Sequence, residues 1–257
     1  MTGFDSTLLK LIVTPALITF ATLVGRRFGQ AVAGWLIAFP WTSAPVSFFL
    51  AVDHGIPFAA AAARGSIAAV AAECAFALSY AWTARGWPIS LVVASAAYLV
   101  TGLAMQFVAL DAILLALLMV ALLFLTSRLL PPTSRRAVAR AVVPAWDLPA
   151  RVAITTAIVL SITAVAPALG PYGSAVAASF PLFASILAVF AERHAGHDAA
   201  LEVMRGLVHG LFGFTTFFVL IAITLEPVGL LAFVIAAAAT LVVQAGSLAV
   251  LRRAERV

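Results

Sequence analysis

The stretch "GWLIAFPWTSAP", Gly34 to Pro45, places two prolines inside an apolar segment that is otherwise typical of a membrane-spanning helix. A proline inside a helix removes one backbone donor and clashes with the carbonyl four residues earlier. The hydrocarbon core offers no water to a freed carbonyl, so such a break is tolerated only where it is packed in protein or lines a cavity. The stretch therefore predicts a broken helix near the centre of a bilayer.

The whole chain has the composition of an integral membrane protein. Of its 257 residues, 64% are hydrophobic and only 10% are charged, and the mean hydropathy is +1.15. The apolar runs are ~18 to 25 residues long, which suits helices crossing ~30 Å of hydrocarbon and exceeds the ~10-residue strands of an outer-membrane barrel. We therefore expect an all-α, polytopic membrane protein with nine transmembrane helices. They are expected at residues 7–25, 31–52, 58–84, 88–107, 109–130, 149–168, 172–191, 198–225 and 228–251.

The basic residues predict an orientation. If the chain crosses the membrane at every expected span, 13 of the 15 Lys and Arg residues fall on one side, and only Lys10 and Arg64 on the other. The positive-inside rule makes the crowded side cytoplasmic, with the N-terminus outside and the C-terminus inside. This asymmetry accounts for the pI of 10.3, so we expect no nucleic-acid partner. An arginine-rich, alanine-rich chain favours a bacterial inner membrane.

An internal repeat appears when the sequence is aligned with itself so that Phe39 falls on Phe180. The single domain, 1–257, then divides into repeat one at 7–107, a linking helix at 109–130, a cytoplasmic linker at 131–148 and repeat two at 148–251. Alanines are too common here to be informative, but rarer residues coincide without a gap. The pairs are Phe39-Pro40 with Phe180-Pro181, Gly55 with Gly196, Arg64-Gly65 with Arg205-Gly206, and Phe76 with Phe217.

The linking helix decides how the two repeats are oriented. Each repeat contains four spans, which return the chain to the side where it started. One extra crossing makes the second repeat enter the membrane from the opposite face. The sequence thus predicts inverted repeats in a 4+1+4 arrangement, which is a signature of alternating-access transporters.

The repeat unit resembles a known family of membrane proteins. "RRFGQAVAGWLIAFPWTSAPVSFFLAVDHG", Arg26 to Gly55, combines a basic loop, a helix rich in small residues, a mid-helix proline and a short acidic loop. In this it resembles the small, four-helix GlpM-like bacterial membrane proteins. The second copy, "GPYGSAVAASFPLFASILAVFAERHAG", keeps the Phe-Pro pair but lacks the basic pair. The resemblance implies a fold unit and residence in a membrane, and implies little about a substrate.

The two proline breaks are the first candidate site. Pro40 and Pro181 occupy equivalent, central positions of the two copies. One interpretation is a structural kink, because proline is common in membrane helices. The other is a substrate site lined by broken helices, which matching breaks in inverted copies favour. The substrate-binding residues expected there are Phe39, Pro40, Trp41, Ser43, Phe180 and Pro181.

Four ionisable residues inside the expected spans are the second set of candidates. Arg64 and Arg205 are matched in the repeat and could grip an anionic substrate through a bidentate guanidinium, or could extend to lipid headgroups. Glu73 lies among alanines, and His209 between Val208 and Gly210. Both could carry a coupling proton, although a helix-to-helix hydrogen bond is an equal alternative for His209.

These features predict a secondary transporter or translocase for an anionic substrate, free or lipid-linked, with membrane lipids as its surroundings. No ATP-binding loop, cofactor motif or metal-ligand spacing is present, and the single cysteine, Cys74, excludes an intramolecular disulfide. A membrane-embedded enzyme is the alternative, with "ERHAGHD", Glu192 to Asp198, as its only candidate cluster, although a solvated polar loop explains that cluster more simply. An accessory membrane subunit is a third hypothesis.

Overall fold

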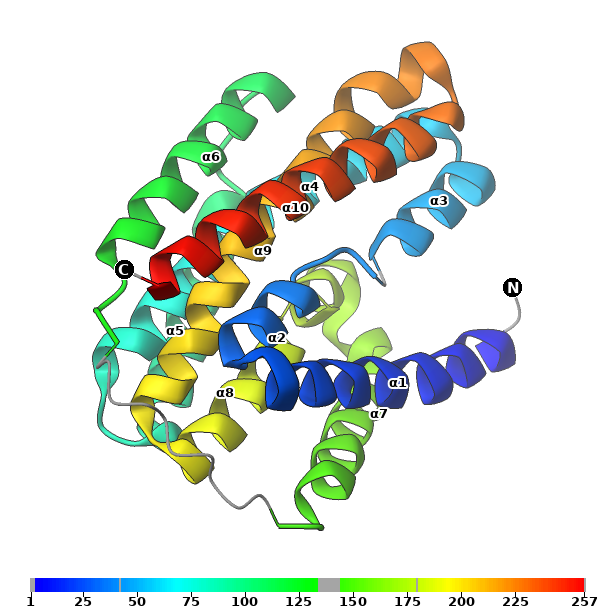
Figure 1. Cartoon of the computed structure of the whole chain (residues 1–257). Coiled ribbons are helices and arrows are strands. Elements are labelled where there is room, and N and C mark those ends of the chain that lie inside the picture. The colour runs from blue at the N-terminus through cyan, green and yellow to red at the C-terminus, as the bar shows by residue number, and fades with distance from the viewer. Residues whose placement is uncertain (1–2, 42, 134–143, 179, 257) are drawn as a thin grey trace.

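The computed structural model describes residues 3–41, 43–133, 144–178 and 180–256, and within these ranges the protein is entirely helical (Figure 1). The all-α prediction is therefore confirmed for the described chain. The helices are α1 (Gly3–Phe28), α2 (Gln30–Ile37), α3 (Ser43–His54), α4 (Ile56–Thr83), α5 (Trp87–Met105), α6 (Ala112–Leu129), α7 (Asp147–Ala178), α8 (Leu182–Ala195), α9 (His197–Val228) and α10 (Leu231–Arg256).

Five helices of the described chain, not nine, are long and apolar enough to cross a membrane: α4, α5, α6, α9 and α10. The prediction of nine spans is wrong in part because two of the expected spans are not continuous. The one expected at 31–52 is divided into α2 and α3, of 8 and 12 residues, and α8 has only 14. The helix end expected at "GPYG" is also absent, because α7 continues through Gly170 to Ala178.

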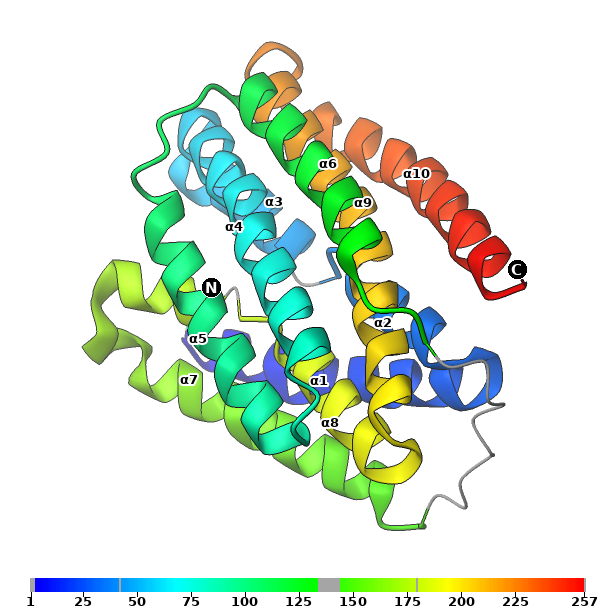
Figure 2. The same ribbon diagram turned by 90° about the vertical axis from the view of Figure 1, so that its left-hand side faces the viewer.

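The centre of the molecule is the crossing of α4 and α9. The two helices pack against each other and run in opposite directions (Figure 2). Helices α3, α5 and α6 pack on α4, while α2, α6, α8 and α10 pack on α9. Most of the large, fully buried side chains lie on these two helices, including Phe76, Tyr80, Phe218 and Ile221. On one side, α1 packs against α2 and α7.

The helix boundaries follow the same offset as the sequence repeat. Helix α3 ends at His54 and α8 at Ala195, while α4 begins at Ile56 and α9 at His197. Between them, Gly55 and Gly196 have φ angles of +91° and +84°, a region in which a side chain is strained, so both turns require glycine. In Figure 2, α5 returns alongside α4 and α10 alongside α9, with the directions of the second pair reversed.

Helix α2 packs unusually close to α9. A Cβ atom added to Gly206 would collide with the backbone of α2 at the Ala31 carbonyl, and one added to Gly34 would collide with the Val203 carbonyl. One turn further along α9, a Cβ atom on Gly210 would lie 2.5 Å from the Ala38 Cβ. "GLVHG", Gly206 to Gly210, thus acts as a small-residue motif that lets α2 and α9 touch through their backbones.

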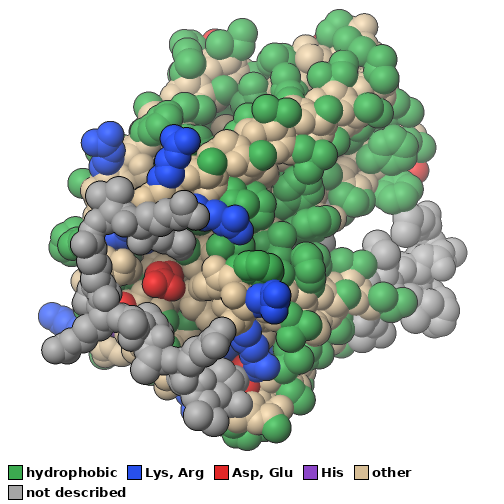
Figure 3. All heavy atoms as spheres, in the orientation of Figure 1, with side chains coloured by type: hydrophobic (Ala, Val, Ile, Leu, Met, Phe, Trp, Pro, Cys, Tyr) green, Lys and Arg blue, Asp and Glu red, His purple; other side chains and the backbone are tan. Residues whose placement is uncertain are grey.

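Charge is distributed unevenly between the two ends of the bundle. One end of the bundle, which we call the basic end, contains the last residues of five helices and the first residues of three others (Figure 2). The helices that end there are α1, α4, α6, α8 and α10, and those that begin there are α5, α7 and α9. In Figure 3 the visible Lys and Arg side chains lie on the left-hand half of this face, and hydrophobic side chains are spread over its upper and right-hand parts. The opposite end carries Asp53, Asp111 and Glu226. The described arginines of the basic end include Arg26, Arg27, Arg85, Arg128, Arg151, Arg193, Arg252 and Arg253, whereas Arg135, Arg136 and Arg140 lie outside the described residues.

Candidate functional site

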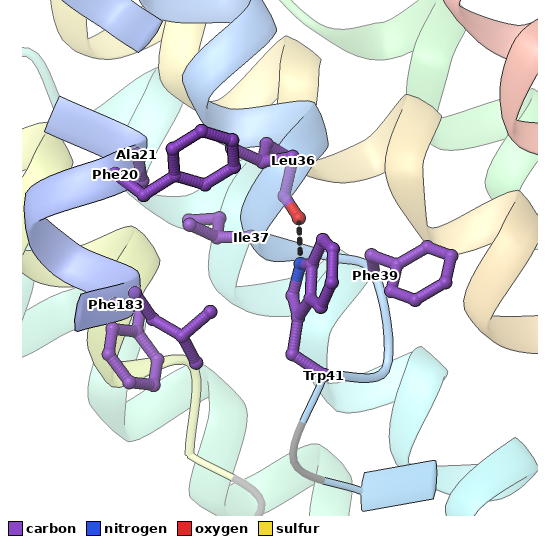
Figure 4. A pocket seen from close by; sticks show the side chains of 8 residues that line it. Phe20, Ala21, Leu36, Ile37, Phe39, Trp41 and Phe183 are labelled. Carbon is purple, nitrogen blue, oxygen red and sulfur yellow. Dashed lines mark hydrogen bonds between the residues drawn. The ribbon is translucent and has the colours of Figure 1, made fainter. Parts of the chain in front are cut away.

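The first break lies between α2 and α3, as "GWLIAFPWTSAP" predicts, and Pro40 is buried within it. The carbonyl that a proline at this position frees is that of Leu36, four residues earlier. This oxygen accepts hydrogen bonds from the Phe39 amide at 3.2 Å and from the Trp41 indole Nε1 at 2.9 Å (Figure 4). Because Trp41 satisfies the carbonyl from within the same segment, the break needs no water at this point.

The second break lies between α7 and α8 and has the same local backbone geometry. The Trp41 amide donates to the Phe39 carbonyl at 2.7 Å, and at the equivalent place in the second copy the Leu182 amide donates to the Phe180 carbonyl, also at 2.7 Å. The φ and ψ angles of Pro181, −74° and 58°, are those of an inverse γ-turn. Each γ-turn is centred on the proline, and in the second one Ser185 Oγ donates to the Pro181 carbonyl at 2.9 Å.

Both breaks adjoin one small pocket of about 40 Å³. From the first break come Phe39 and Trp41, and from the second comes Phe183, two residues after Pro181 (Figure 4). The remaining wall is apolar and is formed by the last turn of α2 and by the middle of α1. The pocket thus suits an apolar group, and its lining contains no charged side chain. Its lining residues are Leu17, Phe20, Ala21, Leu36, Ile37, Phe39, Trp41 and Phe183.

Aromatic contacts tie the second break to the centre of the bundle. The Phe180 ring lies edge-on to Phe76 of α4, with ring centroids 5.7 Å apart, and to Tyr98 of α5 at 5.4 Å. At the first break, Phe39 contacts the neighbouring Trp41 ring at 4.6 Å. Ser43, which begins α3, is half-buried, and Trp41 supplies the side-chain hydrogen bond at this break.

Arg64 and Arg205, the two arginines expected to bind an anionic substrate, do not line this pocket. Arg64 is exposed on α4, which fits an extension to headgroups better than a place in a binding cavity. Arg205 is half-buried on α9, and its Nη2 donates to the carbonyl of Pro131, just after α6. Its Nε is buried and has no hydrogen-bond partner among the described residues. The expectation that Arg64 and Arg205 bind an anionic substrate thus stays a prediction.

The two residues expected to couple protons lie in the central helices. Glu73 is half-buried on α4, one turn before Phe76, and within the described chain no hydrogen bond or ion pair is found for it. His209 Nδ1 lies 2.8 Å from the carbonyl oxygen of Arg205 on its own helix, so this nitrogen carries the donated proton. His209 Nδ1 therefore makes a hydrogen bond within its own helix and not to a neighbouring helix.

A polar cluster at the basic end was not predicted from the sequence. The Asp147 side chain has no solvent exposure, although it stands at the start of α7. Its carboxylate accepts hydrogen bonds from Arg26 Nη2 at 2.8 Å and from Arg151 Nε at 3.0 Å, and lies 2.8 Å from His194 Nε2. Burial alone would raise the pKa of the Asp147 carboxyl, but Arg151 and the three hydrogen bonds outweigh it and lower that pKa.

A second cluster at the same end joins α8 to α4 and α9. Tyr80 Oη donates to Glu192 Oε2 at 2.9 Å, and His197 Nδ1 lies 3.5 Å from the same oxygen. The other ring nitrogen of His197 is 3.0 Å from the carbonyl of Ala81. "ERHAGHD" is therefore not a solvated loop. No group of three metal-ligating side chains occurs among the described residues.

Comparisons with known proteins identify no family for this chain. No protein-family model matches the chain, and no curated protein or solved structure matches it significantly. The resemblance of the repeat unit to GlpM-like proteins therefore stays a prediction. Any function must be argued from the geometry of the chain itself.

Proposed function

We propose that this protein is a membrane transporter or translocase that works by alternating access, with its two proline breaks as the moving region. The observation that carries the proposal is that both breaks, each a γ-turn on a proline, adjoin the same pocket. Backbone that leaves the helical pattern inside a membrane protein is placed where it lines a cavity or changes shape. Two such turns around one pocket are more than helix packing requires.

The pattern of helices supports inverted repeats in a 4+1+4 arrangement, with α6 as the linking helix. The boundaries of α3 and α4 recur in α8 and α9 at the offset of the sequence repeat, which supports a duplication. The opposite directions of α4 and α9, and of α5 and α10, support inversion (Figure 2). Inverted copies can exchange their conformations, which opens one pocket to either face in turn.

Charge and lining together favour an amphiphilic anion, free or lipid-linked, as the substrate class. The pocket beside the breaks is apolar, whereas the basic end carries most of the described arginines. Arg205 is the described arginine with an unused, buried donor. The same charge distribution supports a bacterial inner membrane with the basic end in the cytoplasm. Glu73 and His209 are the proposed proton carriers if transport is coupled to a proton gradient.

Cysteine labelling tests the proposal without knowledge of the substrate. Cys74, which is buried, is the only cysteine and is replaced by alanine. Single cysteines then replace Ala38 beside the first break, which is 5% exposed, and Ala184 beside the second, which is 1% exposed. Two exposed positions, His54 at one end of the bundle and Arg85 at the basic end, serve as controls. A membrane-impermeant maleimide is added to vesicles of either orientation.

Alternating access predicts that both break cysteines react from both sides, and that each control reacts from one side only. The proposal is wrong if a break cysteine reacts from neither side, or from the same single side in both vesicle preparations. Each alanine-to-cysteine change adds one sulfur atom, so folding can be checked by the yield of monodisperse protein. Labelling of Arg85→Cys also reports which face is cytoplasmic.

A membrane-embedded enzyme is the second candidate, and one observation favours it. His194 Nε2 lies 2.8 Å from Asp147 Oδ1, and a histidine oriented by a carboxylate can serve as a general base. The contacts found for His194 in the described chain are with Asp147, Trp146 and Phe190, none of which is a nucleophile. The labelling experiment separates the candidates, because an enzyme does not require break cysteines that react from both sides.

A further inference from the structure

The last turn of α8 is held at the basic end by two sets of polar contacts from four other helices. On one side, His194 reaches Asp147, which also binds Arg26 of α1 and Arg151 of α7. The Arg151 guanidinium in addition lies 4.7 Å above the ring of Phe190. These contacts join the ends of α1, α7 and α8 through one carboxylate that is fully removed from solvent.

On the other side, Glu192 joins the same turn to the centre of the bundle. Its Oε2 accepts the hydrogen bond from Tyr80 of α4 and lies 3.5 Å from His197 of α9. His197 in turn contacts the carbonyl of Ala81, and its ring is stacked parallel to that of Tyr80. Two residues in the same turn of α8, Glu192 and His194, are thus anchored in different directions.

Helix α8 links these contacts to the second break. Its 14 residues extend about 21 Å at 1.5 Å per residue, from the γ-turn at Pro181 to the polar turn. A helix is stiff over this length, so a change of angle at Pro181 displaces the far end of α8. Such a displacement cannot occur while Asp147 and Glu192 both hold that end.

We propose that these contacts form an ionic gate at the basic end, and that Asp147 and Glu192 are the residues that keep it closed. The inference rests on the proposed function, because a gate has meaning only if the breaks become accessible from each side. In the closed gate, α8 is anchored to α1 and α7 by Asp147 and to α4 by Glu192. Opening toward the basic end requires the Asp147 contacts to separate, which frees α8 to tilt at Pro181. These polar contacts can separate and re-form as a unit, while the buried apolar side chains of α8 slide against α9 as the helix tilts.

The test uses a cysteine behind the gate. In the Cys74→Ala background, Ala188→Cys places a thiol at a position of α8 that has no exposure. Asp147→Asn keeps the size of the side chain but removes the charge that three neighbours share. We expect maleimide labelling of Ala188→Cys from the basic end to become at least ten times faster, and labelling from the other face not to increase. Asp111→Asn is the matched control, because Asp111 caps α6 at the opposite end, and labelling should not change.

A second pair of variants guards against misfolding. Should Asp147→Asn not yield folded protein, Arg26→Gln removes only the partly exposed partner of Asp147, and Glu192→Gln weakens the second anchor. Each should accelerate labelling from the basic end, by a smaller factor than Asp147→Asn. Unchanged labelling in folded Asp147→Asn, or in both milder variants, refutes the gate.

Failure of the gate can be told from failure of the proposed function. If Ala38→Cys and Ala184→Cys react from both sides and Asp147→Asn changes nothing, alternating access stands and the gate is wrong. If neither break cysteine reacts from both sides, the proposed function is wrong. In that case, faster labelling of Ala188→Cys in the Asp147→Asn variant also counts against the gate, because the faster labelling then reports only that the end of α8 is less tightly held.

Discussion

The close packing of α2 on α9 gives the most quantitative prediction, because it depends on a single added carbon atom. In Gly206→Ala, the new Cβ would lie 2.7 Å from both the Ala31 carbonyl carbon and the Trp35 amide nitrogen, and closer still to the Ala31 oxygen. Ordinary contacts between such atoms are about 3.5 to 4.0 Å long. All three obstacles are backbone atoms, so α2 as a whole must move away by roughly 1 to 2 Å to restore an ordinary contact.

The magnitude follows from the contacts that this movement weakens. A gap of ~1 Å forfeits up to about half of the dispersion energy between the facing atoms, and overpacking usually costs about 1 to 3 kcal/mol. Alanine has a better helix propensity than glycine by up to about 1 kcal/mol, which offsets part of the loss. The hydrogen bond between Trp35 Nε1 and Ser247 Oγ, 3.0 Å long, is strained by the same movement. We expect Gly206→Ala to lower the free energy of unfolding by about 2 kcal/mol, within the usual range for overpacking.

Gly246→Ala is the matched control for this prediction. Gly246 is also inside a helix, α10, but a Cβ added there meets no atom within 4 Å. It should leave the free energy of unfolding unchanged or raise it by up to about 1 kcal/mol. Unfolding in mixed micelles, by heat or by a denaturing detergent, measures the difference between the two variants, expected to be about 2 to 3 kcal/mol. If Gly206→Ala is as stable as Gly246→Ala, α2 does not lie against the backbone of α9.

Three further predictions concern the breaks and the basic end. Trp41→Phe removes the donor to the Leu36 carbonyl and should lower the free energy of unfolding by about 1 kcal/mol, measured by thermal unfolding in detergent. Replacing both Pro40 and Pro181 with alanine should straighten the helices and abolish labelling of the break cysteines from one side or both, while the yield of folded protein stays within about twofold. Asp147→Asn should lower the free energy of unfolding on the order of 2 to 4 kcal/mol at neutral pH, because two arginines lose their anion. The lowered pKa of Asp147 means that this contribution is fully present above the ordinary carboxyl pKa of about 3.9 and disappears as pH falls through the lowered value, so the two proteins should converge in stability only in strong acid.

Local sequence features predicted those parts of the fold that depend on a few neighbouring residues. Apolar run length indicated membrane helices, and the described chain is helical throughout. The mid-helix prolines indicated breaks, because the effect of a proline on the preceding carbonyl is independent of the rest of the chain. The "GPYG" segment was misjudged for the opposite reason. Glycine and proline favour a helix end without enforcing it, and α7 continues through them.

The site depended on contacts between distant residues, which the sequence order does not reveal. Arg26 and Asp147 are 121 positions apart, and Tyr80 and Glu192 are 112 apart. Asp147 carries one local signal, an arginine four residues later at the correct spacing for a helical ion pair. Trp41 was assigned to the substrate, whereas its indole satisfies the carbonyl that Pro40 frees.

The two breaks are alike in backbone geometry but are flanked by helices that are held in different ways, and this difference has a mechanical consequence. Helix α2, before the first break, is held to α9 by backbone contacts at Gly206 and Gly210, which cannot separate without losing packing along the whole crossing. Helix α8, after the second break, also packs on α9, but its far end is held by the polar contacts of Asp147 and Glu192, which can separate and re-form. If the breaks act as hinges, α2 stays with α9, and α8 is the segment that moves at the basic end.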